Sequence, residues 1–367
     1  MRHIRRTIVL FIALSAAPGL FAQDVLTFAD GERLVGKLVH SSGMSVTFKS
    51  DAIGEVTFDW SKVKELETKE SFAIIPKNVV LKRHGDTSKI AEGTVAVSDQ
   101  KITVTPQTGA PQTVAVPDAD RLVEKTAFDN AIQRRPGFFS DWGGTVTAGA
   151  SFVQSTQKGR GFNSAINLVR IEPDEDWLVR RNRTTVDFRN VYSTLTQPGV
   201  PKVKTNIYHA ATERDEYLSP AWFVFGAAAF DHSFSQGLDL QQTYGGGIGW
   251  SVIRQPNQSL DLKAGVTYVR QSFFVASSDK NLIGSSFEED YQRGLAHGIK
   301  FTEQIIVIPT WNDTSAITAT GNAQLTIPVY KRLNFTLGLT DNYLHNPPPG
   351  FKKNSFQATM GLTYALR

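Results

Sequence analysis

The 367-residue sequence contains no cysteine, which excludes disulfide bonds, thiolate metal sites and a lipid anchor on an N-terminal cysteine. Beyond residue 22 it has no stretch approaching the roughly 18 apolar residues that a membrane-spanning helix needs. It also lacks a basic run suited to nucleic acid. The formal net charge of +4 includes three arginines and no acid in residues 1–22, and 4 − 3 leaves +1 for the remainder. If the rest of the chain crosses a membrane, it must cross as strands.

The first 22 residues have the pattern of a secretory signal peptide. Arg2, Arg5 and Arg6 precede an apolar run from Thr7 to Ala17, and Pro18-Gly19 ends that run. This order of basic start, short apolar centre and break is typical of exported proteins. We predict cleavage after Ala22.

Regular alternation dominates the second half of the sequence. In residues 355–366 one parity is apolar, with Phe356, Ala358, Met360, Leu362, Tyr364 and Leu366, and the other parity is small or polar. Side chains two residues apart share one face of a strand, so this segment predicts a strand with one apolar side. Eleven such runs occur, near 142–154, 161–171, 178–195, 203–217, 221–234, 238–253, 259–273, 290–308, 315–328, 333–344 and 355–366.

The length of these runs indicates a membrane protein. Many have ten or more residues, whereas strands of soluble proteins average about five to six. A tilted strand of about 9–11 residues spans a bilayer. Because single-chain bacterial barrels have an even number of strands, we predict an all-β, transmembrane, antiparallel up-and-down β-barrel of twelve strands, with ten as the alternative.

The sequence divides into five predicted segments. Residues 1–22 form the signal peptide, 23–70 and 71–125 two small β units, 126–141 a connector, and 142–367 the barrel. The two units share a pattern in which a turn (Asp30-Gly31; His84-Gly85-Asp86) precedes a glycine (Gly36; Gly93) and short alternating runs. Such turns between alternating runs favour hairpins. We therefore expect a duplicated β region, followed by a short helix around Phe128–Gln133.

The last forty residues add a more specific pattern. They contain Lys331-Arg332-Leu333, then Thr340 to Leu344, then Asn346-Pro347-Pro348-Pro349-Gly350-Phe351, and then the terminal strand with Gly361-Leu362-Thr363-Tyr364. This stretch resembles the bacterial family of salt-induced outer-membrane proteins, called domain of unknown function 481. The start of the chain is similar to the family as well, in Asp30-Gly31, Phe48 to Asp51 and Trp60-Ser61-Lys62-Val63.

The resemblance implies an outer-membrane barrel and brings no catalytic or binding residue. One departure is Arg367 at the last position, where such barrels usually carry an aromatic residue; Tyr364 and Leu366 are expected to serve instead. With the C-terminus in the periplasm, the loop 345–354 is extracellular and the turn Val329–Arg332 is periplasmic.

The aromatic girdles are predicted at strand ends and include Trp142, Trp177, Trp222, Trp250 and Trp311.

Candidate chemistry is sparse. Beyond the signal the histidines are His40, His84, His209, His232, His297 and His345. His209 and Glu213 share a strand face and Asp231-His232 ends a run, but no Gly-x-Ser-x-Gly motif accompanies them. The charged residues expected in strand interiors, and therefore in the lumen, are Asp187, Arg189, Glu213, Asp261, Lys263 and Glu303. They either set ion selectivity or hold a plugged lumen together.

Three further motifs have ordinary interpretations beside functional ones. Pro347–Pro349 with Lys352-Lys353 forms either a rigid hairpin cap or a phosphate-docking loop. Residues 172–176 form an acidic turn that is either solvated or binds calcium. Gly245-Gly246-Gly247-x-Gly249 lies in a strand, where glycines permit bending or close backbone approach and do not form a phosphate loop.

We therefore predict an integral outer-membrane β-barrel, structural or surface-associated or a narrow pore, with its N-terminal region in the periplasm. It is expected not to be an enzyme, and no catalytic, cofactor-binding or metal-binding residue is assigned. The expected partners are outer-membrane lipid, the barrel-assembly machinery and a periplasmic partner of residues 23–125, and not nucleic acid. The alternatives are an outer-membrane enzyme acting on lipid or peptide, and a soluble periplasmic all-β binding protein.

Overall fold

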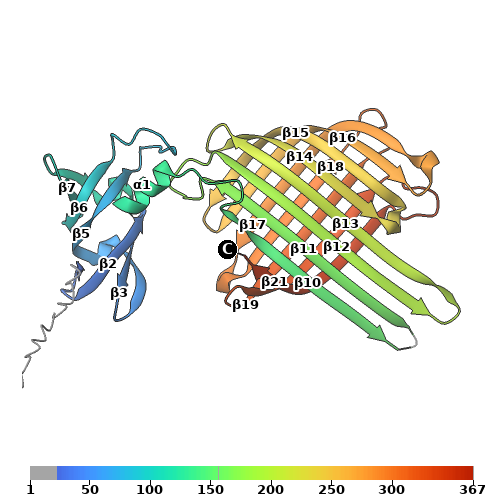
Figure 1. Ribbon diagram of the computed structural model, residues 1–367, viewed down its shortest axis with the longest axis horizontal. Coiled ribbons are helices and arrows are strands. Elements are labelled where there is room, and N and C mark those ends of the chain that lie inside the picture. Colours follow the sequence, from blue (N-terminus) through green and yellow to red (C-terminus); the bar gives the residue numbers. More distant parts are fainter. Residues whose placement is uncertain (1–22, 156, 367) are drawn as a thin grey trace, which may run out of the picture. The chain divides into compact units, whose positions relative to one another are not determined.

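The computed structural model describes residues 23–155 and 157–366 (Figure 1). The predicted signal peptide and Arg367 lie outside these residues. The chain divides into unit 1, Met1–Arg134, and unit 2, Arg135–Arg367. Among the described residues, none of the helices has the length and apolar character needed to cross a membrane.

Over its described residues, unit 1 is a nine-stranded antiparallel β region with one α-helix and two short 3₁₀ helices. Its elements are β1 (Asp24–Phe28), β2 (Arg33–Ser42), β3 (Ser45–Ser50), β4 (Gly54–Asp59), η1 (Trp60–Lys62), β5 (Val63–Pro76), β6 (Ala91–Ser98), β7 (Lys101–Thr105), β8 (Gln112–Ala115), η2 (Val116–Asp118), β9 (Ala119–Glu124) and α1 (Lys125–Gln133). The sheet order is β4-β3-β2-β1-β5-β6-β7-β8, and β9 pairs with both β2 and β5. Strands β1, β2, β9 and β5 therefore close a small ring.

The same succession of elements occurs twice in unit 1. Strands β2, β3 and β4 lead through η1 into β5, and strands β6, β7 and β8 lead through η2 into β9. Strand β5 crosses the predicted boundary at residues 70 and 71 and serves both halves. One buried core joins them, including Leu26, Phe48, Phe72, Ile102 and Leu122.

Asp24 fixes the junction between the two halves of unit 1. Its buried carboxylate accepts hydrogen bonds from the backbone N–H groups of Leu38 and Lys69, both at 2.8 Å.

Replacing Asp24 by Asn removes one acceptor, and an unsatisfied buried N–H costs about 1–3 kcal/mol. We expect Asp24→Asn to speed amide exchange at Leu38 and Lys69 in the full chain, measured by hydrogen-exchange mass spectrometry. The exposed Asp51→Asn change should leave this exchange unaltered, and equal rates in both variants would contradict the assignment.

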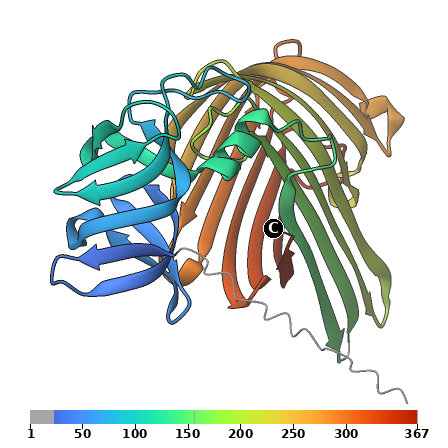
Figure 2. The same cartoon turned by 60° about the vertical axis from the view of Figure 1, so that its left-hand side comes forward.

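Unit 2 is a closed barrel of twelve strands, which confirms the predicted fold and strand number. The strands are β10 (Trp142–Gln154), β11 (Lys158–Glu172), β12 (Asn182–Gln197), β13 (Val200–Tyr217), β14 (Trp222–Ser233), β15 (Leu238–Gln255), β16 (Gln258–Phe273), β17 (Lys280–Gly294), β18 (Lys300–Ile308), β19 (Thr318–Tyr330), β20 (Leu333–Leu344) and β21 (Asn354–Ala365). Each pairs with its neighbour in the sequence, and β21 pairs with β10 (Figures 1 and 2). The predicted run 290–308 is two strands, β17 and β18, separated by the turn 295–299.

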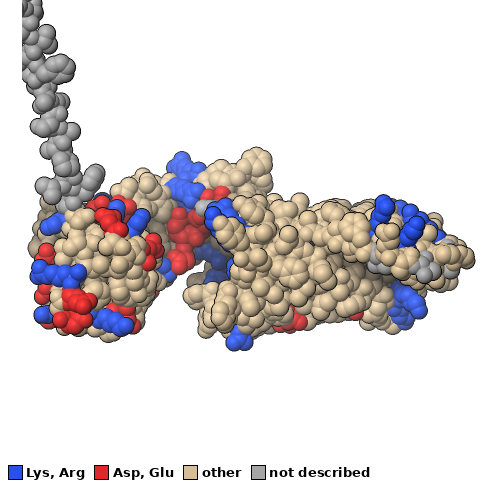
Figure 3. Space-filling model, turned by 90° about the horizontal axis from the view of Figure 1, so that it is seen from below, with Lys and Arg blue, Asp and Glu red and all other residues tan. Residues whose placement is uncertain are grey.

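The barrel wall has an apolar outer face. Highly exposed apolar side chains follow the parity that the alternation predicts, among them Phe152, Phe356 and Met360, which are 77%, 66% and 63% exposed. On the face of the barrel that Figure 3 shows, the outer wall between the two ends is almost free of charge. Trp222 and Trp250 stack on this face with ring centroids 5.7 Å apart. These aromatic rings sit where an amphipathic side chain meets a membrane–water boundary.

Candidate functional site

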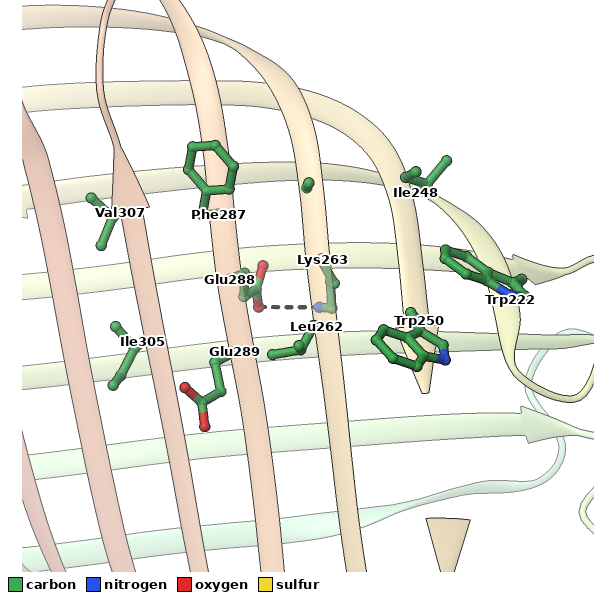
Figure 4. A pocket seen from close by; sticks show the side chains of 11 residues that line it. Trp222, Ile248, Trp250, Leu262, Lys263, Phe287, Glu288, Glu289, Ile305 and Val307 are labelled. Atoms are coloured by element: carbon green, nitrogen blue, oxygen red, sulfur yellow. Dashed lines mark hydrogen bonds and ion pairs between the residues drawn. The ribbon is translucent and has the colours of Figure 1, made fainter. Parts of the chain in front are cut away.

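The main charged cluster of the lumen centres on Lys263 of β16. Its side chain is 3% exposed, and Nζ lies 2.6 Å from Glu213, 3.1 Å from Glu288 and 2.8 Å from Asp290. Glu213 comes from β13, while Glu288 and Asp290 come from β17. Figure 4 shows the Lys263–Glu288 pair between the two neighbouring strands. One ammonium group therefore links three carboxylates from three strands.

A second cation extends this cluster towards the end of the barrel where β10 begins and β21 ends, here called the terminal end. Arg183 of β12 contacts Asp215 at 2.6 Å and Asp261 at 2.8 Å. We call the seven residues Arg183, Glu213, Asp215, Asp261, Lys263, Glu288 and Asp290 the lumen charge network. It holds five carboxylates against two cations, so its formal charge is negative.

Small residues of β14 and β15 make room for this network. Between Glu213 and Lys263 these strands present Ala227, Gly245, Gly247 and Gly249 to the lumen. A Cβ atom at Gly247 would lie 2.1 Å from the backbone oxygen of Ala264. The glycine motif seen in the sequence thus permits close backbone approach and leaves space for charged side chains to cross.

Phenylalanine rings lie beneath both cations. The Lys263 ammonium lies 5.7 Å from the Phe225 ring centroid, and the Arg183 guanidinium 5.6 Å from that of Phe223. A cation over an aromatic face is attracted by the ring's charge distribution. These rings therefore help to hold the two cations in the lumen.

A histidine cluster lies further from the terminal end. His209 Nδ1 is 2.6 Å from Asp231, and Nε2 is 3.7 Å from Asp187, which also pairs with Arg189 at 2.7 Å. Arg189 reaches Asn322 on β19 at 2.5 Å. This contact links β12 to a strand on the other side of the lumen. We call Asp187, Arg189, His209 and Asp231 the histidine cluster.

The part of the lumen wall formed by β19, β20, β21 and β10 is polar, and none of its described inward side chains is charged. On β19, β20, β21 and β10 the inward positions are mostly Thr, Ser, Asn, Gln and Gly, including Thr318, Thr320, Asn322, Gln324, Thr326, Thr340, Gln357, Thr359, Thr145 and Thr147. Most are half-buried, whereas Asp261, Lys263 and Thr267 on β16 are buried. Water therefore reaches the uncharged wall, and the charge network borders that space.

The opposite, distal end is narrowed by a segment that crosses it. Gln236, in η3 (Phe234–Gln236) between β14 and β15, donates from Nε2 to the backbone oxygens of Asn342 and Lys353 at 3.0 and 2.8 Å. Strands β14 and β15 lie across the ring from β20 and β21. Leu238, Phe273 and Leu344 pack into a buried apolar cluster at this end.

A second loop is anchored at the distal end, between β18 and β19. Asp313 accepts hydrogen bonds from Lys280 at 2.8 Å and from Ser315 at 2.6 Å. These bonds lower the pKa of Asp313 to about 2, so the carboxylate keeps its charge at acidic pH values where an ordinary aspartate becomes protonated. Ala316 of the same loop is buried against Val269 and Leu282.

The structure places five of the six predicted lumen charges in the lumen: Asp187, Arg189, Glu213, Asp261 and Lys263. Glu303 is the exception, because it lies opposite Tyr291 on the outward face of β18. The expectation for Glu303 was wrong, since it shares its parity with the apolar Phe301, Ile305 and Val307.

An outward hollow of about 460 Å³ lies on the same wall, lined mainly by apolar side chains such as Trp250 and Phe287, with Glu289 (Figure 4).

Sequence reasoning missed Arg183, Asp215, Glu288 and Asp290 as members of the network. The available signal was their alternation with outward-facing residues, as in the order Phe287-Glu288-Glu289-Asp290. His209 and Glu213 share the lumen face of β13, as predicted, and the hydrogen-bond partner of His209 is Asp231 of the adjacent strand. His232 faces outward and stacks on Tyr208 with centroids 4.9 Å apart.

A closed, even-stranded, up-and-down barrel with an apolar outer face and a polar lumen is a transmembrane β-barrel of the outer-membrane type. The chain belongs to the family described as protein of unknown function, DUF481, whose model matches residues 146–366. This confirms the resemblance seen in the sequence. None of the curated proteins matches the chain.

The chain is similar to several solved structures at low sequence identity. An outer membrane channel from Pseudomonas putida F1 has 9% identity and a TM-score of 0.36, covering 64% of this chain and 100% of its own. The translocator domain of autotransporter NalP from Neisseria meningitidis has 11% identity and a TM-score of 0.32, covering 61% and 87%. BamA from Haemophilus ducreyi lacking POTRA domains 1–3 has 9% identity and a TM-score of 0.22, covering 90% and 75%. These scores support no inference about function.

Proposed function

We propose that the barrel is a narrow, cation-selective pore of the outer membrane. The observation that carries this proposal is the excess of carboxylates around the water-accessible part of the lumen. In the lumen charge network five carboxylates face two cations, and in the histidine cluster two carboxylates face Arg189 and His209. Rings of acidic side chains favour the passage of cations. The crossing segment η3 keeps the pore narrow.

Asp290 and Asp231 are the network and cluster carboxylates most accessible to water, at 31% and 29% side-chain exposure. They can meet a hydrated ion, whereas Asp215 at 1% cannot. Removing their charges should therefore affect selectivity without opening the buried centre of the network.

The test is the reversal potential of the refolded protein in a planar bilayer under a KCl gradient. The native protein should favour potassium over chloride. Asp231→Asn/Asp290→Asn should move the reversal potential towards zero, because the lumen loses two formal negative charges. The matched control is Glu303→Gln, which removes an acid from the outward face of β18 and should leave the reversal potential unchanged. Correctly folded protein without conductance, or with chloride preference, would contradict the proposal and favour a structural barrel with a plugged lumen.

We further propose that the terminal end, and with it unit 1, faces the periplasm. Four of the five turns at the terminal end have two to five residues, and 173–181 is the exception with nine. At the distal end the loops 309–317 and 345–353 have nine residues each. Short periplasmic turns and longer extracellular loops are usual in such barrels. Protease added to intact cells should therefore reach the distal loops and spare residues 23–134.

A non-enzymatic role forms part of the same proposal. Both nitrogens of His209 face carboxylates, an arrangement that orients the ring within a polar cluster. A hydrolase would need the ring to face a nucleophile. Loss of a lipase or protease activity in His209→Ala would favour the enzyme instead.

The remaining partners are proposals of the same kind. Outer-membrane lipid meets the apolar wall, and the barrel-assembly machinery handles the strands during insertion. The strands β4 and β8 end the main sheet order of unit 1, so their outer edges can pair with an extended segment of a periplasmic partner.

A further inference from the structure

Four cations gather on the outward face of the barrel near its distal end. They are Lys158 and Arg160 of β11 and Lys202 and Lys204 of β13, and all four are exposed. Arg160 and Lys204 both pair with Thr194 of the intervening strand β12, which places them on the same outer face. Lys158 lies two residues further along β11 on that face, paired with Gln154 and Thr196. The exposed Lys202 lies two residues from Lys204, beside a β-bulge in the pairing of β13 with β12. We call these four residues the outward cation cluster.

The cluster has no neighbouring acid. The other outward positions at these strand ends are Phe152, Gln154, Thr194 and Thr196. Within the described part of the chain, no ion pair joins the four cations to a carboxylate. Figure 3 shows Lys and Arg gathered at this end of the barrel without Asp or Glu among them. Four like charges side by side repel one another, so the surface is best stabilised by an external anion.

The cluster begins where the apolar wall ends. Phe162 and Tyr192 are paired one step closer to the terminal end, and Lys204 lies over the Tyr192 ring at 5.8 Å. An aromatic ring below a cation is the order found at a membrane–water boundary, with the ring in the interface and the charge at the headgroups.

The spacing along β11 supports this depth. The next cation of the same parity on the strand is Arg170, ten residues from Arg160, with Phe162, Ser164, Ile166 and Leu168 between them. Its side chain is buried, donates to the backbone oxygen of Ser140 and pairs with Glu172. Ten residues span about 33 Å along a strand, and the usual tilt reduces this to roughly 25 Å across the membrane. That is the height of the apolar band of such barrels, so Arg160 lies at the headgroup level.

We propose that the outward cation cluster binds the phosphate groups of a phosphorylated lipid in the distal leaflet. The outward direction of the side chains selects a membrane lipid over an ion in the lumen, since the cluster faces away from the pore. With the orientation proposed above, this leaflet is the outer one. The binding itself does not depend on that orientation or on conductance.

The test is the affinity of refolded protein in neutral detergent for bisphosphorylated lipid A, measured by native mass spectrometry at low and high salt. The variant replaces the cluster by glutamine: Lys158→Gln/Arg160→Gln/Lys202→Gln/Lys204→Gln. Each Lys or Arg near an anionic surface contributes a factor of about five. The variant should therefore bind roughly 600-fold more weakly at low salt, and binding to the native protein should weaken with salt.

Three controls separate the explanations. Lys49→Gln/Lys62→Gln/Lys64→Gln/Lys101→Gln removes equal charge from exposed positions of unit 1 and should retain the native affinity. Lys158→Arg/Lys202→Arg/Lys204→Arg keeps the charge and should also retain it. Inorganic phosphate at the lipid's concentration should not compete. Unchanged affinity in the glutamine variant, equal weakening in the charge-matched control, or displacement by inorganic phosphate would overturn the proposal. The heat-dependent shift in gel mobility shows that each variant is folded.

Discussion

Replacing Lys263 by Met should destabilise the barrel by about 3–5 kcal/mol, because it leaves buried charges without their partner. The ammonium group of Lys263 is the common partner of Glu213, Glu288 and Asp290. Once it is removed, three carboxylates from β13 and β17 repel one another in a site that water hardly reaches. Urea unfolding of the refolded protein in detergent, followed by loss of the heat-dependent gel shift, measures the effect.

Two comparison variants show whether charge is the cause. Lys263→Met/Glu213→Gln/Glu288→Gln removes two of the stranded carboxylates and should recover most of the lost stability. Lys300→Met changes an exposed lysine at the start of β18 and should unfold like the native protein. If the triple variant is no more stable than Lys263→Met, the loss arises from packing of the lysine stem and not from the uncompensated acids.

Alternation alone was sufficient to predict the architecture of unit 2. The outward parity of β21, from Phe356 to Tyr364, is the one read from the sequence, because lipid and lumen impose opposite requirements on neighbouring residues. The missed strand boundary lies at the turn 295–299. This turn contains no proline and only one change from apolar to polar residues, so the sequence gives a weak signal for a turn. A one-strand error followed, although the rule of even strand number corrected the count.

The lumen contacts could not be read from the sequence in the same way. Parity places Lys263 and Glu213 inside, but their contact joins β13 to β16, across two other strands. Such pairings depend on the shear and cross-section of the barrel, which neighbouring residues do not encode. The hydrogen bond from Gln236 to the backbone oxygen of Lys353 was equally hard to predict, since it joins loops more than a hundred residues apart.

Replacing Gly247 by Ala should prevent the barrel from folding. A Cβ atom there would lie 2.1 Å from the backbone oxygen of Ala264 and 2.5 Å from the Cα of Gly265. Both atoms belong to the adjacent strand β16, and backbone cannot rotate away as a side chain can. The two strands would have to separate locally and lose ladder hydrogen bonds, so the cost should exceed the roughly 1–3 kcal/mol of ordinary overpacking. The measurement is the folded fraction after refolding, from the gel band that shifts on heating.

Gly226→Ala is the matched control, because Gly226 is a glycine of the neighbouring strand β14 with no atom within 4 Å of an added Cβ. It should refold as the native protein does. Gly247 also lies in the space that Glu213 and Lys263 cross, so an added methyl group would affect the lumen charge network as well as the sheet. A Gly247→Ala protein that folds with native stability and native ion selectivity would show that neither the close strand approach nor the glycine-lined space is needed. If it folds but loses cation selectivity, the space for the network is the more important of the two.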